Sequence, residues 1–267
     1  MTEGFIDVNG ARLWYWDTGG GGAALFLCHP ASQGCLAWEN QRDAFAEAGY
    51  RVIGYSRRGH HPSETGPTDN PGTTIDDLGG LMDALGIDRA HILGAAAGGI
   101  TALGFACRFP TRVLSLILAG TIFAPDEDDW RAMHARLDVA SIKDAASAAF
   151  LELGPAYRAA NPEGVARFAA LSEQALAKKG DYNQPTGAKV NWATLEALAT
   201  PALLITGEAD LYSPPPMQEM VAGHLREHEL MTLPAIGHAP YWEAPGAFNA
   251  AVLSFLRALQ SNQRHRS

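Results

Sequence analysis

Residues 93–99 read LGAAAGG and lie between the apolar run 91–95 and a segment rich in small residues. Gly94 and Gly98 stand on either side of a three-residue centre, a spacing typical of the sharp strand-to-helix turn that presents a catalytic nucleophile. Ala96 occupies the middle of that centre, and its methyl group cannot act as a nucleophile. The segment is therefore either an ordinary turn or an active site that lacks its reacting atom.

The segments around this turn alternate between apolar strands and amphipathic helices. We expect strands at 23–29, 51–56, 91–95, 113–120, 201–210 and 228–234. We expect helices at 37–50, 73–87, 97–110, 217–225 and 244–259. Residues 5–17 predict a β-hairpin, because Asn9-Gly10 supplies the positive φ angles of a tight turn. This alternation predicts an α/β fold, with a mostly parallel sheet covered by helices on both faces.

The alternation breaks between Phe123 and about Val190. Helical stretches at 129–154 and 162–180 follow one another there without a convincing strand. We therefore expect a helical cap over 122–190, inserted into a core formed by 1–121 and 191–267. No internal repeat is evident.

The composition of the chain limits the classes of partner that the protein is expected to bind. The chain has 267 residues, of which 47% are hydrophobic and 18% charged, as expected for one large α/β domain or a domain with an inserted subdomain. The net charge of −9 argues against nucleic acid and anionic membranes, since both require a cationic surface. We expect a small-molecule partner and a monomer or homodimer.

The amino terminus has no signal-peptide pattern, and no uninterrupted apolar run suggests a membrane span. The three cysteines, Cys28, Cys35 and Cys107, have no metal-ligand spacing and indicate a reduced, cytoplasmic protein. We expect no metal and no cofactor. Cys35 lies in a predicted loop and is kept as a remote alternative nucleophile.

Candidate reacting groups follow successive strands. In a parallel sheet, ligands bind at the carboxyl ends of the strands. The loop 29–34, HPASQG, can direct the backbone N–H of Ala31 at a developing oxyanion, and the N–H of Ala97 lies at a helix N-terminus. Asp210 follows the next apolar strand, in LLITGEAD, and His238 follows the last one. Nucleophile position, acid and histidine in this order are expected for a hydrolase triad.

With these residues identified, the sequence resembles the α/β-hydrolase superfamily, of the single-domain type with a helical cap after the sixth of eight strands. The resemblance extends over essentially the whole chain except the cap. It is carried by DVNGARLWYW (7–16), FLCHP (26–30), YSRRGHHPS (55–63), LGAAAGG (93–99), LLITGEAD (203–210) and GHAPYWEAP (237–245).

The resemblance implies a role for each matching position. It makes His238 the general base, Asp210 the acid that orients it and Ala96 the occupant of the nucleophile position. The N–H groups of Ala31 and Ala97 become the oxyanion donors. Besides Ala96, two departures affect the site: Pro30 replaces a glycine usual in relatives, and Ser56 and His61 replace an aspartate and a glycine.

Substrate contacts are predicted from residue type and position. Aromatic side chains of the cap and core suit a partly apolar small molecule, although core packing explains most of them. Arg57 and Arg58 are candidates to pair with a substrate carboxylate, although a structural salt bridge is the simpler interpretation. The candidate substrate-binding residues are His29, Ser32, Trp38, Arg57, Trp130 and Tyr241.

Two interpretations of Ala96 remain open. In the first, which we adopt, alanine replaces a natural serine and leaves an inactive form of an enzyme that cleaves an ester, lactone or activated C–C bond. In the second, Ala96 is natural and the His238–Asp210 dyad activates water or removes a substrate proton, as in a cofactor-free lyase or oxygenase. A non-catalytic small-molecule receptor is a further alternative.

Overall fold

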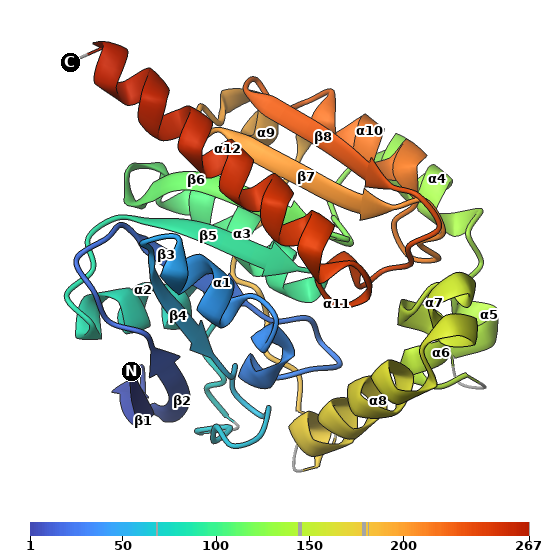
Figure 1. Ribbon diagram of the computed structural model, residues 1–267, viewed down its shortest axis with the longest axis horizontal. Coiled ribbons are helices and arrows are strands. Elements are labelled where there is room, and N and C mark those ends of the chain that lie inside the picture. Colours follow the sequence, from blue (N-terminus) through green and yellow to red (C-terminus); the bar gives the residue numbers. More distant parts are fainter. Residues whose placement is uncertain (68, 144–145, 178–179, 181, 267) are drawn as a thin grey trace.

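The computed structural model describes residues 1–67, 69–143, 146–177, 180 and 182–266, and it contains a central sheet with helices on both sides (Figure 1). Its strands run in the order β1-β2-β4-β3-β5-β6-β7-β8. β2 pairs antiparallel with β1 and β4, and the other pairings are parallel. The strands are β1 (Thr2–Val8), β2 (Ala11–Asp17), β3 (Ala24–Cys28), β4 (Arg51–Tyr55), β5 (Ala90–Ala95), β6 (Val113–Ala119), β7 (Ala202–Gly207) and β8 (His228–Leu233). The predicted mostly parallel, eight-stranded sheet is confirmed.

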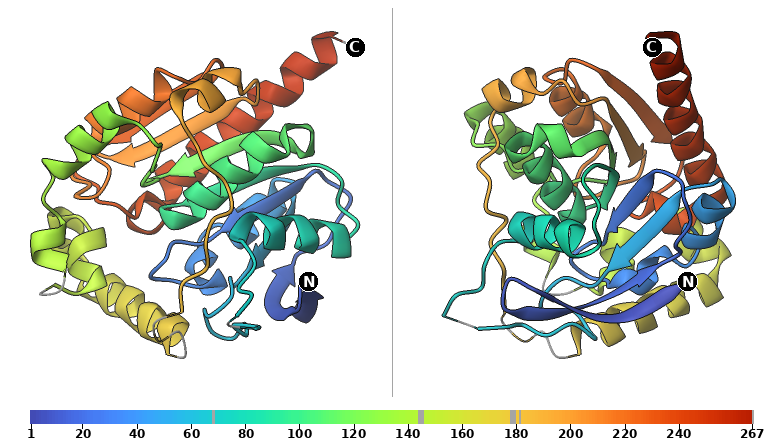
Figure 2. Two further views of the ribbon diagram at one scale, coloured as in Figure 1. Left: turned by 180° about the vertical axis from the view of Figure 1, so that it is seen from behind. Right: turned by 90° about the vertical axis from the view of Figure 1, so that its left-hand side faces the viewer.

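Two apolar layers hold the core helices against the sheet. Alternate side chains of β3 point to opposite faces: Leu25 and Leu27 join the cluster that contains Phe248 of α12, whereas Phe26 joins the cluster that contains Phe105 of α3. Figures 1 and 2 show α1 and α12 on one face and α2, α3 and α10 on the other. These helices are α1 (Arg42–Glu47), α2 (Thr74–Ala84), α3 (Ala97–Arg108), α10 (Pro215–Ala222) and α12 (Pro245–Arg266).

Shorter elements complete the core. They are η1 (Cys35–Trp38), η2 (Pro110–Arg112), α9 (Trp192–Ala197) and α11 (Pro240–Glu243). None of the helices in the described ranges is long and apolar enough to cross a membrane.

The segment predicted as a cap is helical over most of its described length. It contains α4 (Asp128–Ala135), α5 (Ala140–Lys143), α6 (Ala148–Glu152), α7 (Pro155–Ala160) and α8 (Pro162–Leu176). Figure 1 shows α5 to α8 grouped beyond the ends of the strands, whereas α4 lies near α10 of the core. Residues 182–190 form no helix and run along the core, where the N–H of Thr74 donates to the carbonyl of Pro185 over 3.0 Å. The boundaries 122–190 therefore remain a prediction, since both ends of this segment contact the core.

Candidate active site

The turn after β5 has the strained geometry of a nucleophile elbow. Ala96 lies between β5 and α3 with φ 48° and ψ −116°, a conformation that residues with a Cβ adopt rarely. Its N–H donates to the carbonyl of Ala119 over 2.9 Å, and its carbonyl accepts from Gly99 over 3.0 Å. These bonds fix the turn, so the strain is held by the neighbouring strand and helix.

Glycine is required at the start of α3 because this helix lies against the backbone of β3. A Cβ at Gly98 would collide with the carbonyl of Cys28. A Cβ at Gly94 would collide in turn with the backbone of Gly98. The glycines of LGAAAGG therefore allow α3 to lie close behind the turn, which brings the N-terminal amides of α3 to the site.

His238 and Asp210 form a buried pair. The Nδ1 atom of His238 lies 2.9 and 2.8 Å from the two carboxylate oxygens of Asp210. Asp210 is fixed by the N–H groups of Tyr212 and Ser213, which donate to its Oδ1 over 2.8 and 3.0 Å. Because an ionised carboxylate can only accept, Nδ1 of the neutral ring carries the proton and Nε2 keeps a lone pair. This tautomer allows Nε2 to act as a base.

The charges around His238 favour its protonated form. Burial lowers the pKa of the ring, but the charge and hydrogen bond of Asp210, together with the charges of Glu152 and Glu243, outweigh burial. The net pKa of His238 therefore lies above its ordinary value. A base with a raised pKa accepts a proton from a weak acid more readily, although it is deprotonated only at higher pH.

A cleft of about 470 Å³ opens beside Ala96 and His238. Its lining is Pro30, Ala31, Ser32, Ala96, Ala97, Ile122, Ala146, Ala148, Leu151, Glu152, Leu176, Gly180, Tyr212 and His238. Among the described residues, the N–H of Ala31 donates no hydrogen bond. Ala97 begins α3, so its N–H has no acceptor one turn back. The cleft thus brings together the nucleophile position, the histidine and both proposed oxyanion amides.

His29 supports this cleft and does not line it. Its buried ring is hydrogen-bonded through Nδ1 to the carbonyl of Pro30 over 2.7 Å, and its Nε2 accepts from the N–H of Arg57 over 2.9 Å. His29 is therefore not among the lining residues, contrary to the substrate contact predicted for it, and its bonds join the loop that carries the Ala31 amide to Arg57. Ser32 does line the cleft, where its hydroxyl donates to Glu152 over 2.8 Å.

Three predicted aromatic contacts are corrected. Trp38 and Tyr241 are fully buried in one core cluster, with ring centroids 4.9 Å apart, and Trp130 is buried in the other. None of the three lines the cleft in the described structure. Cys35 is also buried, and burial raises its pKa to about 11, so it is a poor nucleophile.

Glu152, which was not among the residues predicted from sequence, ends α6 inside the cleft. Burial raises its pKa, against the opposing effects of the His238 charge and the Ser32 hydrogen bond. Its backbone carbonyl also accepts the N–H of His238 over 2.8 Å, so α6 holds the histidine loop. The stretch LELG carries no motif, and only a half-buried carboxylate in a tertiary context distinguishes it.

Glu243 joins the cap to the histidine loop. Its Oε2 accepts the N–H of Gly154 over 2.9 Å, and its Oε1 accepts the N–H of Gly237 over 3.0 Å. Burial raises its pKa to about 7, against the opposing effect of these backbone hydrogen bonds. Both oxygens of Glu243 therefore accept backbone N–H groups, one from Gly154 after α6 and one from Gly237 beside His238.

We expect Glu243→Gln to lower the free energy of unfolding by about 1–3 kcal/mol, because the new NH₂ group faces one of two buried N–H donors. Urea unfolding at pH 8 measures this loss, with the exposed Glu163→Gln as the matched control. An unchanged midpoint in both variants would contradict the structural role.

The same variant tests a pH dependence. The pKa of Glu243 is about 7 in the folded protein, above its ordinary value of 4.5, so the folded state binds more protons between these values. The stability contributed by this group is therefore present at low pH and is lost as pH rises through about 7. We expect this part of the pH dependence to be absent in Glu243→Gln, measured as unfolding midpoints between pH 5 and 8.

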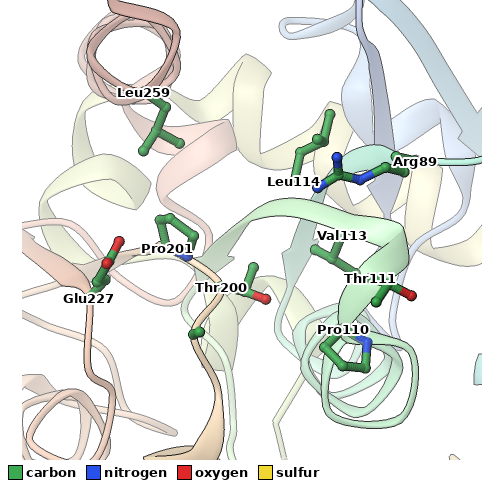
Figure 3. Close-up of a pocket in the computed structure, with 10 residues that line it drawn as sticks. Arg89, Pro110, Thr111, Val113, Leu114, Thr200, Pro201, Glu227 and Leu259 are labelled. Carbon is green, nitrogen blue, oxygen red and sulfur yellow. The ribbon is translucent and has the colours of Figure 1, made fainter. Parts of the chain in front are cut away.

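A second large cavity, of about 440 Å³, lies at the opposite ends of the strands (Figure 3). Arg89, Leu114 and Glu227 contribute to its lining, together with the segments that precede β6 and β7. None of the predicted site residues faces it, and no described cluster of His, Cys, Asp and Glu is arranged to hold a metal ion. The catalytic candidates therefore belong to the cleft at Ala96.

Comparisons with known proteins identify the family and the fold of this chain. A family model described as alpha/beta hydrolase fold matches residues 23–245. A putative carbamate hydrolase RutD from a Caulobacter species is 31% identical over 231 residues, which cover 82% of this chain and 85% of that protein. A 2-hydroxy-6-oxononadienedioate/2-hydroxy-6-oxononatrienedioate hydrolase from Burkholderia vietnamiensis is 41% identical over 116 residues. That match covers 41% of this chain and only 40% of the relative.

Solved structures give matches over nearly the whole chain. A hydrolase from Pseudomonas aeruginosa has a TM-score of 0.77 and 28% identity, over 95% of this chain and 98% of that one. An enol-lactonase from Burkholderia xenovorans has a TM-score of 0.75 and 25% identity, over 95% of this chain and 100% of that one.

Proposed function

Because this chain belongs to the alpha/beta hydrolase fold family, we propose that its cleft is built to hydrolyse an ester, lactone or activated C–C bond of a small carbonyl substrate. In this proposal Ala96 stands where the reacting form has serine. One observation carries it: Ala96 retains the strained conformation of a nucleophile elbow in a cleft that also contains His238.

The proposed reaction is acyl transfer. With serine at position 96, His238 takes the hydroxyl proton while the oxygen attacks the carbonyl carbon. The amides of Ala31 and Ala97 stabilise the resulting oxyanion, and Asp210 stabilises the imidazolium. The imidazolium then protonates the leaving group, and water releases the acyl group by the same steps. In this route the chain with Ala96 binds substrate and does not form the acyl-enzyme.

The substrate class follows from the cleft and from its relatives. The lining is apolar along Ile122, Leu151 and Leu176 and polar at Ser32 and Glu152, which suits a small, partly apolar carbonyl compound. Relatives whose names specify hydrolysis of an oxo-dienedioate and of an enol-lactone support carbonyl substrates of this size.

Labelling tests the proposal directly. We expect a fluorophosphonate probe to label the Ala96→Ser protein at position 96 and not to label the protein with Ala96. Mass spectrometry of the labelled peptide identifies the site. A serine at position 96 that is neither labelled nor active on a panel of esters and lactones, while the Ala96 protein turns over substrate, would refute the acyl-transfer route.

Glu152 favours a second candidate in which Ala96 is natural. A half-buried carboxylate with a raised pKa lies in the same cleft as His238. His238 would then deprotonate a water molecule or a substrate C–H directly, with Glu152 as a second group that can hold a proton. This candidate requires turnover by the Ala96 protein and no gain from Ala96→Ser.

The charge of Glu152 also predicts a pH effect. Because this charge contributes to the raised pKa of His238, we expect Glu152→Gln, made in the Ala96→Ser protein, to move the acid limb of kcat/KM to lower pH. The amide oxygen can still accept from Ser32, so the loop is kept. The exposed Glu173→Gln is the control, and pH profiles that coincide for all three proteins would contradict this effect.

A further inference from the structure

A smaller cavity, of about 180 Å³, adjoins the cleft. Ala31 and Ala97 line both spaces, so the two are separated by the residues that carry the proposed oxyanion amides. Arg57, Thr101, Tyr182 and Asn183 provide polar groups around the smaller space. We call this smaller space the Arg57 cavity; because it shares Ala31 and Ala97 with the cleft, it lies within a short distance of a carbonyl held beside Ala96.

Arg57 carries a charge for which the described part of the chain provides no hydrogen-bond partner on Nε or Nη2. Its Nε and Nη2 atoms are shielded from solvent and have no hydrogen-bond partner among the described residues. Burial lowers the pKa of this guanidinium from its ordinary value. A buried cation without a counter-charge is costly to the fold, so an unpaired one beside an active site indicates a ligand.

Arg58, the next residue in the chain, forms a structural salt bridge that can be compared with Arg57. Arg58 uses Nε and Nη2 to hold both oxygens of Asp77, over 2.7 and 2.8 Å. Arg51 uses the same edge on Asp17. Arg58 therefore forms a structural salt bridge, as the simpler interpretation of the two arginines predicts. The equivalent edge of Arg57 is unpaired among the described residues.

The carboxylate of Asp77 is already hydrogen-bonded to other side chains. Besides Arg58, Asp77 accepts the side-chain N–H of Gln184 over 2.7 Å and that of Asn9 over 3.3 Å. Arg57, Arg58 and His60 are among the described residues that line the Arg57 cavity, none of those lining residues carries a carboxylate, and Arg58 is paired with Asp77. Arg57 lines this cavity and its Nε–Nη2 edge has no partner among the described residues; a planar carboxylate matches such an edge with two parallel hydrogen bonds.

We propose that the Arg57 cavity binds a carboxylate of the substrate, so that the preferred substrates are short acids whose scissile carbonyl lies a few bonds from the carboxylate. The substrate class follows as half-esters, lactones or oxo derivatives of dicarboxylic acids. This inference rests on the proposed function, from which it takes the position of the scissile carbonyl. The preference for a substrate carboxylate rests on Arg57 alone.

Binding to the protein with Ala96 tests the inference without turnover. The probes are the monomethyl esters of succinic, glutaric and adipic acids, each compared with its neutral dimethyl ester, and ligand-detected NMR gives the affinities at pH 7. We expect at least one monoester to bind about tenfold or more tighter than its diester, because its carboxylate pairs with a buried guanidinium. Equal affinities within every pair, or no monoester binding, would overturn the inference.

Arg57→Met assigns the preference to this residue. We expect it to weaken monoester binding about 10- to 100-fold while the diester changes by less than about twofold. Arg89→Met removes the same charge at the cavity in Figure 3 and is expected to change neither. Equal weakening of both esters by Arg57→Met would show that Arg57 only supports the fold. Should this variant not fold, Arg57→Lys retains the charge and is expected to bind the monoester more weakly than Arg57.

The same probes separate the inference from the proposed function. If Ala96→Ser hydrolyses none of the esters while monoester binding still depends on Arg57, the acyl-transfer proposal fails and the carboxylate site stands. If Ala96→Ser hydrolyses monoesters and diesters with equal kcat/KM and binding shows no preference, the proposed function stands and the carboxylate site is refuted.

Discussion

The Ala96→Ser protein is expected to hydrolyse activated esters about 10³- to 10⁶-fold faster than the protein with Ala96, the upper value being close to the loss in kcat when a protease loses its serine nucleophile. The upper value applies if binding and the oxyanion amides already function. Serine is close to alanine in size, and the turn at position 96 already has its strained φ of 48°. Substitution therefore adds a hydroxyl without requiring a new backbone conformation.

Initial rates with p-nitrophenyl acetate and butyrate measure this gain, and a burst of p-nitrophenol equal to the enzyme concentration identifies the acyl-enzyme. Ala148→Ser is the matched control, because Ala148 also lines the cleft but does not lie at the elbow. Equal gains from both substitutions would mean that any hydroxyl in the cleft suffices. No gain from Ala96→Ser, together with turnover by the Ala96 protein, would favour the His238–Asp210 water route.

The fold was predictable largely because the central strands are apolar on both faces. β3, β5 and β7 are buried at every position, so their sequences are short continuous apolar runs bounded by loops. The hairpin was predictable for a local reason, since Asn9 and Gly10 both have the positive φ that a two-residue turn requires. Such features are encoded within a few residues and need no tertiary information.

The position of the candidate site was predictable, but the identity of its lining was not. Ala96, Asp210 and His238 each follow a strand, and strand ends converge in a parallel sheet. Trp38 and Trp130 have the same side-chain chemistry whether they face a ligand or the core, so sequence cannot separate these alternatives. Residue type also cannot show that Glu152 lies beside His238, because the two come from segments 86 residues apart whose contact is tertiary.

Asp210→Asn, made in the Ala96→Ser protein, is expected to lower kcat by about 10⁴-fold, the loss that follows when a triad aspartate becomes asparagine in a serine protease. The asparagine introduced at position 210 can still accept the N–H groups of Tyr212 and Ser213 through its carbonyl oxygen. Its NH₂ group would then face Nδ1 of His238 and favour the tautomer that is protonated on Nε2. In that tautomer the histidine cannot take the serine proton, although the loop geometry is unchanged.

The pH profile separates this tautomer effect from simple misfolding. Because the charge of Asp210 raises the pKa of His238, kcat/KM of the Ala96→Ser protein is expected to fall as pH decreases through a value above 6.5, the ordinary pKa of histidine. Removing that charge lowers the pKa, so the acid limb of the residual activity should move to lower pH in Asp210→Asn. The exposed Asp88→Asn should leave both rate and limb unchanged. A loss of rate with an unshifted limb would indicate that Asp210 supports the fold without acting on His238.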